Sequence, residues 1–317
     1  MPTRRAMLTL TGLAALPAMA AETRLLDDAG RMVALPPSPR RIASLDDMGL
    51  TVPLLELGIT PVASVGRPGR DGKPFIRGAL ALTGDDFGTN DMRFLGMRPI
   101  DLETLVAARP DLILTPLGAA ATPEQLAAIA PTFVLDDRAR GGAATYALLA
   151  RLTGREAEAA RLERRYQAQL AELRRAYRPE RFTVAVISAT GDGKLSLDHT
   201  YGSLGQVLRD AGFRFPAIYD GIPPHQAVVL SPELLQSVEA DIIIDTYRDD
   251  RLEMPAAADR RLRALHPDYC RFLDACRAGR LVVLPRDAAM AVSYQSRSLA
   301  IGALTTLLGG EFGRTRP

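Results

Sequence analysis

A proline-free stretch over residues 143–177 divides the chain into two halves that repeat one pattern. Its apolar residues recur three or four positions apart, which is typical of a helix with one buried face. At 1.5 Å per residue a continuous helix of this length would span about 50 Å, more than one lobe is wide, and Gly154 is where we expect a kink. Strand-like and helix-like segments alternate on either side. We therefore predict an α/β protein of two lobes, residues 21–142 and 178–317, joined by a single long helix.

Each half contains one helix start of the form Thr/Ser-Pro-Glu, at residues 122–124 and 231–233, and an apolar strand-like run follows each. A capping hydroxyl, a proline at the first helical position and an acid in the first turn satisfy free amides and complement the helix dipole. Local chemistry accounts for such starts without any function. The pattern nevertheless places one glutamate, Glu124 or Glu233, at a similar point of each lobe.

The remaining segments read as short elements. The segment 64–96 is rich in glycine and charge and has no period, so we predict a long loop there that lines a site. The other predicted elements of the first half are a hairpin at 23–35, a strand at 41–45 leading into a helix that ends near Gly58, a helix at 101–108, and strands at 111–115 and 132–135. Those of the second half are strands at 182–188, 241–246 and 280–284, and helices at 203–211, from 231, and at 296–308.

The first 20 residues have the pattern of an export signal. Arg4 and Arg5 precede an apolar run over 6–16, and residues 18–20 supply the small side chains that signal peptidase requires. The paired arginines favour the twin-arginine pathway, and the general secretory route is the alternative. No cysteine stands directly after the cleavage site, and no later segment is apolar enough to span a membrane. We therefore predict a periplasmic protein without a lipid anchor.

The balance of charge argues against nucleic acid as a partner. The chain has 39 Lys and Arg against 37 Asp and Glu, and the leader carries two arginines and no acid. The mature chain is therefore balanced, whereas a nucleic-acid-binding protein would carry a basic face.

The cysteines and histidines give little support to a metal site. Cys270 and Cys276 are six residues apart in a predicted helix, which places them on different faces, so we expect buried thiols rather than a disulfide. His199, His225 and His266 are scattered, without the spacing of metal ligands. We therefore predict no resident metal or cofactor.

Three groups of residues form recognisable motifs. They are LLDDAGRMVALP at 25–36 with PRRIA at 39–43, LGMR at 95–98 with DLETL at 101–105, and RPDLIL at 109–114. Together they resemble the periplasmic iron-siderophore-binding proteins of ABC importers, closest to the ferric-hydroxamate (ferrichrome-type) members. The resemblance implies a class III periplasmic binding protein fold, in which two Rossmann-like lobes are joined by a long helix and hold the ligand between them. It implies a monomer without catalytic activity that captures a ferric siderophore and delivers it to an inner-membrane permease.

The resemblance also implies roles for individual residues. Glu124 and Glu233 match the acidic residues, one per lobe, that dock onto arginines of the permease. Arg98 matches an arginine that contacts the iron-coordinating oxygens, a role that suits a permanently charged fork of donors. Tyr219 and Tyr294 align with aromatic residues of the ligand cleft, and ordinary core packing is the alternative for both. The other ligand contacts that we predict are Arg67, Arg297 and His225.

The chain departs from ferrichrome-type relatives in the surface that it offers a ligand. It has no tryptophan, whereas those relatives line the cleft with several, and Ala119 or Ala120 stands where they carry a tyrosine. The predicted loops are instead rich in arginine, which suits an anionic ferric chelate such as a carboxylate or mixed citrate-hydroxamate siderophore. These arginines are Arg67, Arg70, Arg77, Arg93, Arg98, Arg248, Arg286 and Arg297.

Two other functions are weighed against this one. The first is capture of haem or cobalamin by a protein of the same fold. The second is a secreted α/β hydrolase, which the sequence disfavours because it has no G-x-S-x-G elbow and its histidines have no obvious nucleophile partner.

Overall fold

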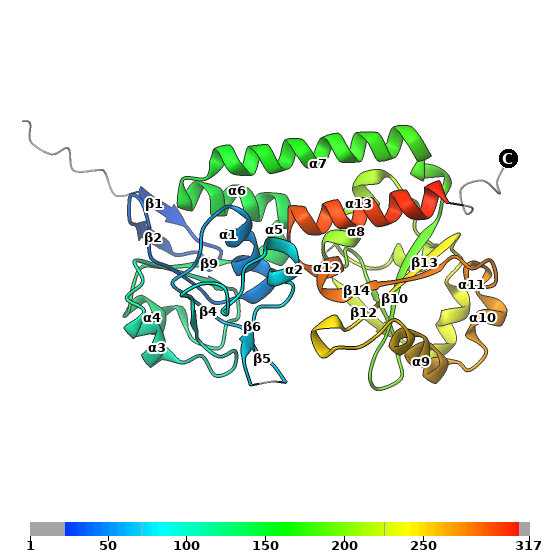
Figure 1. Ribbon diagram of the computed structural model, residues 1–317, viewed down its shortest axis with the longest axis horizontal. Helices are drawn as coiled ribbons and strands as arrows, with labels where there is room; N and C mark the ends of the chain where they lie inside the picture. Colours follow the sequence, from blue (N-terminus) through cyan, green and yellow to red (C-terminus); the bar gives the residue numbers. More distant parts are fainter. Residues whose placement is uncertain (1–22, 71, 225, 311–317) are drawn as a thin grey trace, which may run out of the picture.

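The computed structural model describes residues 23–70, 72–224 and 226–310, which form two α/β lobes bridged by one long helix (Figure 1). The predicted export signal at 1–20 and His225 lie outside the described residues. Within the described residues, no helix combines the length and the apolar character that a membrane span requires.

The N-terminal lobe is built on five parallel strands in the order β7-β4-β3-β8-β9. Strands β3, β8 and β9 are buried almost throughout, which explains why they are largely apolar runs rather than alternating ones. Numbered within the lobe, the order is 3-2-1-4-5, the arrangement of dinucleotide-binding folds. The strands are β3 (Ile42–Ser44), β4 (Ala63–Ser64), β7 (Arg93–Phe94), β8 (Leu112–Pro116) and β9 (Thr132–Leu135).

Short helices and two small hairpins surround this sheet. The hairpins are β1 (Thr23–Leu26) with β2 (Met32–Leu35) and β5 (Arg67–Pro68) with β6 (Pro74–Phe75). The helices are α1 (Val52–Glu56), α2 (Ala79–Thr83), α3 (Leu102–Ala107), α4 (Pro123–Ala127), α5 (Asp137–Arg140) and α6 (Gly142–Thr153). The prediction of a plain loop at 64–96 was wrong, because the segment holds α2, β5, β6 and β7, elements too short to show a period.

The C-terminal lobe repeats the strand order in the sheet β12-β11-β10-β13-β14. Here β11 runs antiparallel to both neighbours, while the other four strands are parallel to one another. The strands are β10 (Val184–Ala189), β11 (Leu195–Asp198), β12 (Ala227–Leu230), β13 (Ile242–Tyr247) and β14 (Leu281–Pro285). The helices are α8 (Gly202–Ala211), the 3-10 helix η4 (Pro232–Ser237), α9 (Ala256–Leu265), α10 (Tyr269–Phe272), α11 (Asp274–Arg277), α12 (Arg286–Met290) and α13 (Tyr294–Gly309). The predicted α/β class and two Rossmann-like lobes are confirmed.

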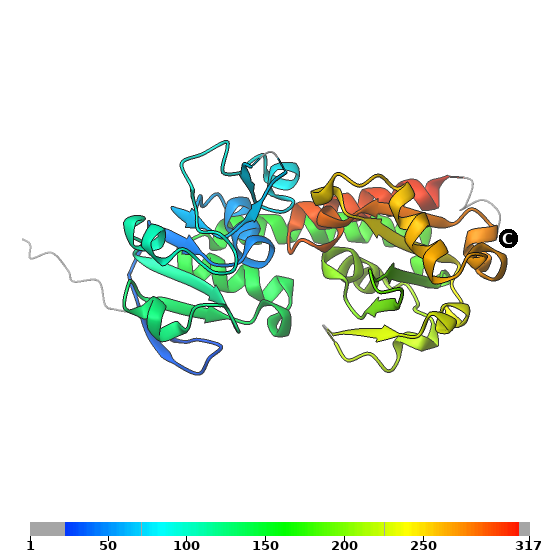
Figure 2. The same cartoon turned by 90° about the horizontal axis from the view of Figure 1, so that it is seen from below.

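The bridge between the lobes is α7 (Glu156–Tyr177), not one helix over 143–177. Gly154 adopts a left-handed conformation with φ of 67°, which ends α6 and reverses the chain, so the predicted continuous helix was wrong. The 22 residues of α7 span about 33 Å. Acids in its first turn and arginines in its last complement the helix dipole. Figures 1 and 2 show α7 running over both lobes.

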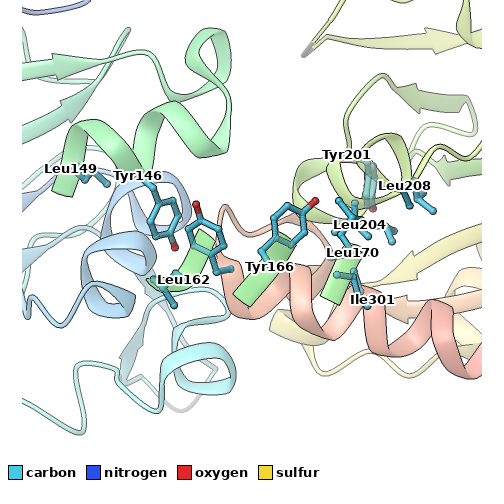
Figure 3. Packing of buried hydrophobic residues seen from close by; sticks show 14 of the residues in the cluster. Tyr146, Leu149, Leu162, Tyr166, Leu170, Tyr201, Leu204, Leu208 and Ile301 are labelled. Atoms are coloured by element: carbon cyan, nitrogen blue, oxygen red, sulfur yellow. The ribbon is translucent and has the colours of Figure 1, made fainter. Parts of the chain in front are cut away.

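A single hydrophobic core continues beneath α7 from one lobe into the other. It includes Leu149 of α6, Tyr166 and Leu170 of α7, Leu204 of α8 and Ile301 of α13 (Figure 3). Because this core is shared, the lobes are held by packing as well as by the chain connection.

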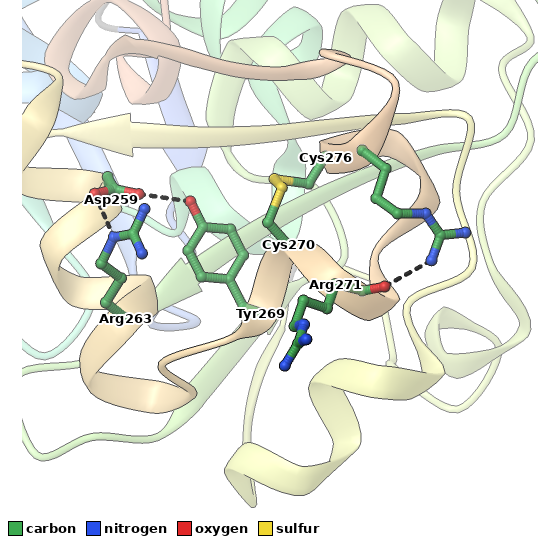
Figure 4. The surroundings of a disulfide bond; sticks show 7 residues. Asp259, Arg263, Tyr269, Cys270, Arg271 and Cys276 are labelled. Carbon is green, nitrogen blue, oxygen red and sulfur yellow. Dashed lines mark hydrogen bonds and ion pairs between the residues drawn. A yellow bond between two sulfur atoms is a disulfide. The ribbon is translucent and has the colours of Figure 1, made fainter.

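Cys270 and Cys276 form a disulfide, so the prediction of two buried thiols was wrong (Figure 4). The expected helix is two single turns, α10 and α11, separated by Leu273 in an extended conformation. This break brings the two Cα atoms to 5.1 Å, within the range that a disulfide requires.

Candidate functional site

The strand order of each lobe points to the edge where a ligand would bind. In open α/β sheets, ligands bind outside the carboxyl ends of the strands where the order reverses, here between β3 and β8 and between β10 and β13. We call the residues that follow these carboxyl ends the interlobe face. It comprises 45–47, 65–67, 95–98, 117–119 and 136–137 in the N-terminal lobe and 190, 248–250 and 286–287 in the C-terminal lobe.

The two halves of the interlobe face touch each other beside Arg77. A Cβ added at Gly78 would lie 3.5 Å from the Cβ of Asp287 in the opposite lobe. Burial lowers the pKa of Arg77, but the hydrogen bond with Asp47 and the charges of Asp47, Asp287 and Asp250 raise it overall. Arg77 therefore interacts with carboxylates of both lobes.

Several carboxyl groups gather at this contact, and two of them titrate near neutral pH. Burial, and then the charge of Asp47, raises the pKa of Asp46 to about 6. Burial, and then the charges of Asp249 and Asp250, raises the pKa of Asp287 to about 7. Within the described residues, no group of three or more His, Cys, Asp or Glu side chains could hold a metal ion.

Arg98 lies on the turn after β7 and is exposed. Its side chain has no hydrogen bond or ion pair among the residues that the structure describes. The nearby Asp101 caps α3 and accepts hydrogen bonds from the amide and hydroxyl of Thr104 at 2.9 and 2.7 Å. Arg98 is therefore available to a ligand.

Arg67 lies on the interlobe face but already has a partner. Its Nε is 3.3 Å from Oδ2 of the buried Asp47, and the Nε of Arg77 is 3.1 Å from the same oxygen. Two guanidinium groups share one carboxylate, and the charges of Asp250 and Asp287 also act on Arg77. Ligand contact by Arg67 stays a prediction.

The C-terminal half of the interlobe face carries Arg248 after β13 and Arg286 after β14. Burial, and then repulsion from Arg286, lowers the pKa of Arg248. Neither side chain forms a salt bridge within the described part of the chain. Two neighbouring cations without a bound carboxylate make a site that favours an anion.

Three predicted ligand contacts lie elsewhere. Tyr219 belongs to the C-terminal core, and its buried hydroxyl donates to the carbonyl of Val186 at 2.6 Å and accepts from its amide at 3.0 Å. Tyr294 and Arg297 are buried at the start of α13, where the lobes join, and the guanidinium of Arg297 lies 4.6 Å from the centre of the Tyr294 ring. Core packing therefore accounts for Tyr219, and packing where the two lobes join accounts for Tyr294 and Arg297.

Glu124 and Glu233 are both exposed, and each follows the carboxyl end of a strand, β8 or β12. The local structures differ. Thr122 caps α4 and forms a capping box with Gln125, whereas Ser231 makes no capping hydrogen bond and η4 is a 3-10 helix. The two glutamates differ in position as well as in helix type, because β8 lies beside the first strand of its sheet whereas β12 lies at the edge of its sheet.

Sequence reasoning missed the acidic side of the site. Asp46, Asp47, Asp249 and Asp287 each follow a predicted core strand within a few residues. Because carboxyl ends of parallel strands meet at one edge, that placement could have identified them. Glu56, at the end of α1, does not follow a strand, so the same reasoning would not have identified it.

Comparisons with known proteins agree with this architecture. A family described as periplasmic binding protein matches residues 81–287. Staphylococcus aureus SirA, solved in complex with staphyloferrin B, is 21% identical with a TM-score of 0.73, and the match covers 92% of this chain and 99% of that one. The FhuD protein from S. pseudintermedius is 16% identical with a TM-score of 0.70, covering 92% and 99%. VctP from Vibrio cholerae, a periplasmic catecholate-siderophore binding protein, is 17% identical with a TM-score of 0.66, covering 92% and 100%. No curated protein sequence matches the chain. At these identities the likeness to solved structures shows the fold.

Proposed function

The chain belongs to the periplasmic binding protein family, and from that membership we propose that it captures a ferric siderophore between its lobes and delivers it to an ABC permease. The observation that carries the proposal is the family match over 81–287 on a fold of two lobes whose strand ends face each other. Capture and release between lobes need no catalytic group, so we propose no enzymatic activity.

The proposed ligand class follows from the ligands that are named for solved structures of the same fold. SirA was solved with staphyloferrin B, and VctP is named for catecholate siderophores. These names favour a ferric siderophore over the alternative of haem or cobalamin. The ferric chelate is cargo, and no resident cofactor is part of the proposal.

Within that class we propose an anionic chelate. Arg98 on one lobe and Arg248 and Arg286 on the other lack carboxylate partners among the described residues, so a negatively charged ligand would complete their hydrogen bonds. The chain has no tryptophan to stack against a neutral ligand. A carboxylate or mixed citrate-hydroxamate siderophore fits this surface better than the neutral ferrichrome complex.

Two further parts of the proposal concern location and partner. We propose that the leader with Arg4 and Arg5 exports the protein to the periplasm by the twin-arginine route, and that the mature protein works there as a monomer without a lipid anchor. We also propose that Glu124 and Glu233, exposed on separate lobes, dock onto the permease. Two contacts far apart fix an orientation although each exposed ion pair is weak.

Calorimetric titration of the purified mature protein tests the ligand. The panel contains a ferric citrate-type siderophore, ferrichrome, hemin and cyanocobalamin, with the iron-free siderophore as the matched control. We expect the anionic ferric chelate to bind most tightly and the iron-free form to bind weakly. Tightest binding of hemin or cyanocobalamin would overturn the siderophore assignment, while tightest binding of ferrichrome would overturn only the charge preference.

A further inference from the structure

Glu56, the last residue of α1, makes a contact between the lobes that the proposed function does not use. Its Oε2 accepts a hydrogen bond from the amide of Tyr294 at 2.8 Å, and its Oε1 accepts one from the amide of Gln295 at 2.6 Å. These two amides form the first turn of α13, which packs on α7 and α8 in the C-terminal lobe. A carboxylate of one lobe thus caps the last helix of the other.

The cap is electrostatically favourable and directional. The first amides of a helix have no partner within the helix, and the N-terminal end of its dipole attracts negative charge. Ser293 satisfies only the amide of Ser296. The carboxylate of Glu56 therefore supplies acceptors that α13 does not provide for itself, and charge-assisted bonds of this length tolerate little displacement.

Other residues hold Glu56 in place and brace the same helix end. The hydroxyl of Tyr146 on α6 donates to Oε2 of Glu56, and burial, then the charge of Glu56, raises the pKa of that tyrosine well above its usual range. The hydroxyl of Tyr294 donates to Glu163 of α7 at 2.6 Å. We call Glu56, Tyr146, Glu163, Tyr294 and Arg297 the interlobe joint.

Arg297 adds a second contact across the joint. Its guanidinium lies over the rings of Tyr294 and Tyr166, at 4.6 and 5.1 Å from their centres. A Cβ added at Gly142, the first residue of α6, would lie 2.2 Å from Nη2 of Arg297. The C-terminal helix therefore fits closely against the N-terminal lobe at two points, Glu56 and Gly142.

Packing leaves an opening beside the joint, so hydrogen bonds add to the shared core in setting its geometry. A pocket of about 240 Å³ lies against Glu56, lined by residues of α1, α2, α7 and α13. A pocket between elements of both lobes means that side-chain packing alone does not fill their junction. The helix α7 connects the lobes along one line, so a bond away from that line is what would resist rotation about it.

We propose that Glu56 is a positioning residue that fixes the angle between the two lobes, and therefore the width of the interlobe face, by capping α13 from the opposite lobe. The inference concerns the free protein and is independent of which ligand binds. Loss of the carboxylate releases the N-terminus of α13 from α1, and the lobes then sample a range of angles about α7.

Distance measurements by double electron-electron resonance on the free protein test this role. Spin labels are attached at Ala127→Cys and Gln236→Cys, exposed positions on different lobes, and the native cysteines do not interfere because they form a disulfide. The variant is Glu56→Gln, which keeps the size of the side chain and loses its charge and one acceptor. The matched control is Glu158→Gln, an α7 carboxylate paired only with Arg161 of the same helix.

We expect one narrow interlobe distance in wild type and in Glu158→Gln, and a broadened or shifted distribution in Glu56→Gln. A merely stabilising role would lower the melting temperature of Glu56→Gln and leave the distance distribution unchanged, which would overturn the proposal. If Glu56→Gln does not fold, Tyr146→Phe removes one of the three donors to the carboxylate and should broaden the distribution to a lesser extent. An unchanged distribution in Tyr146→Phe would then overturn the proposal.

Discussion

At the scale of single residues, Arg98 and Arg297 show how surroundings decide what a guanidinium group can bind. Arg98 is exposed on the interlobe face, and its side chain has no partner among the described residues. Arg297 is 3% exposed and stacked between tyrosine rings at the interlobe joint. An arginine of the first kind can gain hydrogen bonds when an anion arrives, whereas one of the second kind would have to leave its packing.

Replacement of Arg98 should therefore directly weaken the binding of the ferric chelate. Arg98→Ala removes a charged hydrogen-bond donor that would face the ligand. The loss costs on the order of 1.5 to 3 kcal/mol of binding free energy, or roughly tenfold to a hundredfold in affinity. Arg98→Lys keeps the charge but loses the fork and should recover part of the loss. Calorimetry with the chelate that binds most tightly measures both, with Arg24→Ala, an exposed arginine of β1, as the control. Wild-type affinity in Arg98→Ala would exclude Arg98 from the ligand site.

Asp245 of β13 carries a prediction about pH. It is fully buried, its Oδ1 accepts the amide of Thr246 at 2.7 Å, and its Oδ2 has no partner among the described residues. Burial raises its pKa from 3.8 to about 7, so the folded state favours the protonated form. Between these two values the native state binds more protons than the unfolded state, and stability must fall as pH rises, by at most about 1.4 kcal/mol per pH unit for one proton.

The Asp245→Asn variant removes the carboxyl group that binds this proton. The free energy of unfolding of wild type, measured in guanidinium chloride, should fall from pH 5 to pH 8, and the fall should be smaller in Asp245→Asn. Asp192→Asn is the control, because the Asp192 side chain is 66% exposed. Equal slopes in wild type and Asp245→Asn would show that Asp245 is already ionised at pH 5.

At the scale of elements, the parts with a strong period could be predicted and the parts set by tertiary contacts could not. The strands β3, β8, β9, β10, β13 and β14 all lie where apolar runs placed them. The reversal at Gly154 was missed because one glycine between two helical patterns reads as a kink, and only the packing of α6 on the N-terminal lobe turns it into a chain reversal. The disulfide was missed because neither proline nor glycine marks the helix break at Leu273 in the sequence.

The two Thr/Ser-Pro-Glu starts give a prediction with a built-in control. Thr122 caps α4 through the amide of Gln125, whereas Ser231 makes no such bond at η4. Thr122→Ala should therefore lower the free energy of unfolding by about 1 kcal/mol, while Ser231→Ala should change it by less than about 0.5 kcal/mol. Chemical denaturation measures both. Equal losses would mean that Ser231 caps its helix in solution.

At the scale of the whole molecule, residues after the carboxyl ends of the two sheets come together beside Arg77. That arrangement could be expected once two α/β lobes were predicted, since each lobe binds at its switch point. The charge interactions across the lobes could not, because Arg77 and Asp47 are far from Asp287 in sequence and lie near it only through the angle that α7 and the interlobe joint impose. Ligand contact by the exposed arginines thus stays a prediction, and the carboxylates beside them were missed from the sequence.

Docking is the prediction that belongs to this scale, because it needs both lobes at once. Glu124 and Glu233 are exposed, and the proposed function assigns them to the permease rather than to the ligand. The double variant Glu124→Ala, Glu233→Ala should therefore keep the ligand affinity of wild type and reduce transport through the permease. Either single variant should reduce transport less, since one remaining contact still favours the docked complex but no longer fixes its orientation.

The matched control is Glu103→Ala with Glu239→Ala, which removes one exposed glutamate from each lobe near the same helices. Uptake of radioactive iron chelate in proteoliposomes that contain the permease separates the two steps, because affinity is measured on the free protein. Transport by the docking variant at the rate of the control would refute the assignment. A parallel loss of ligand affinity would instead place the glutamates at the ligand, and the distance between them would then have to close when the chelate binds.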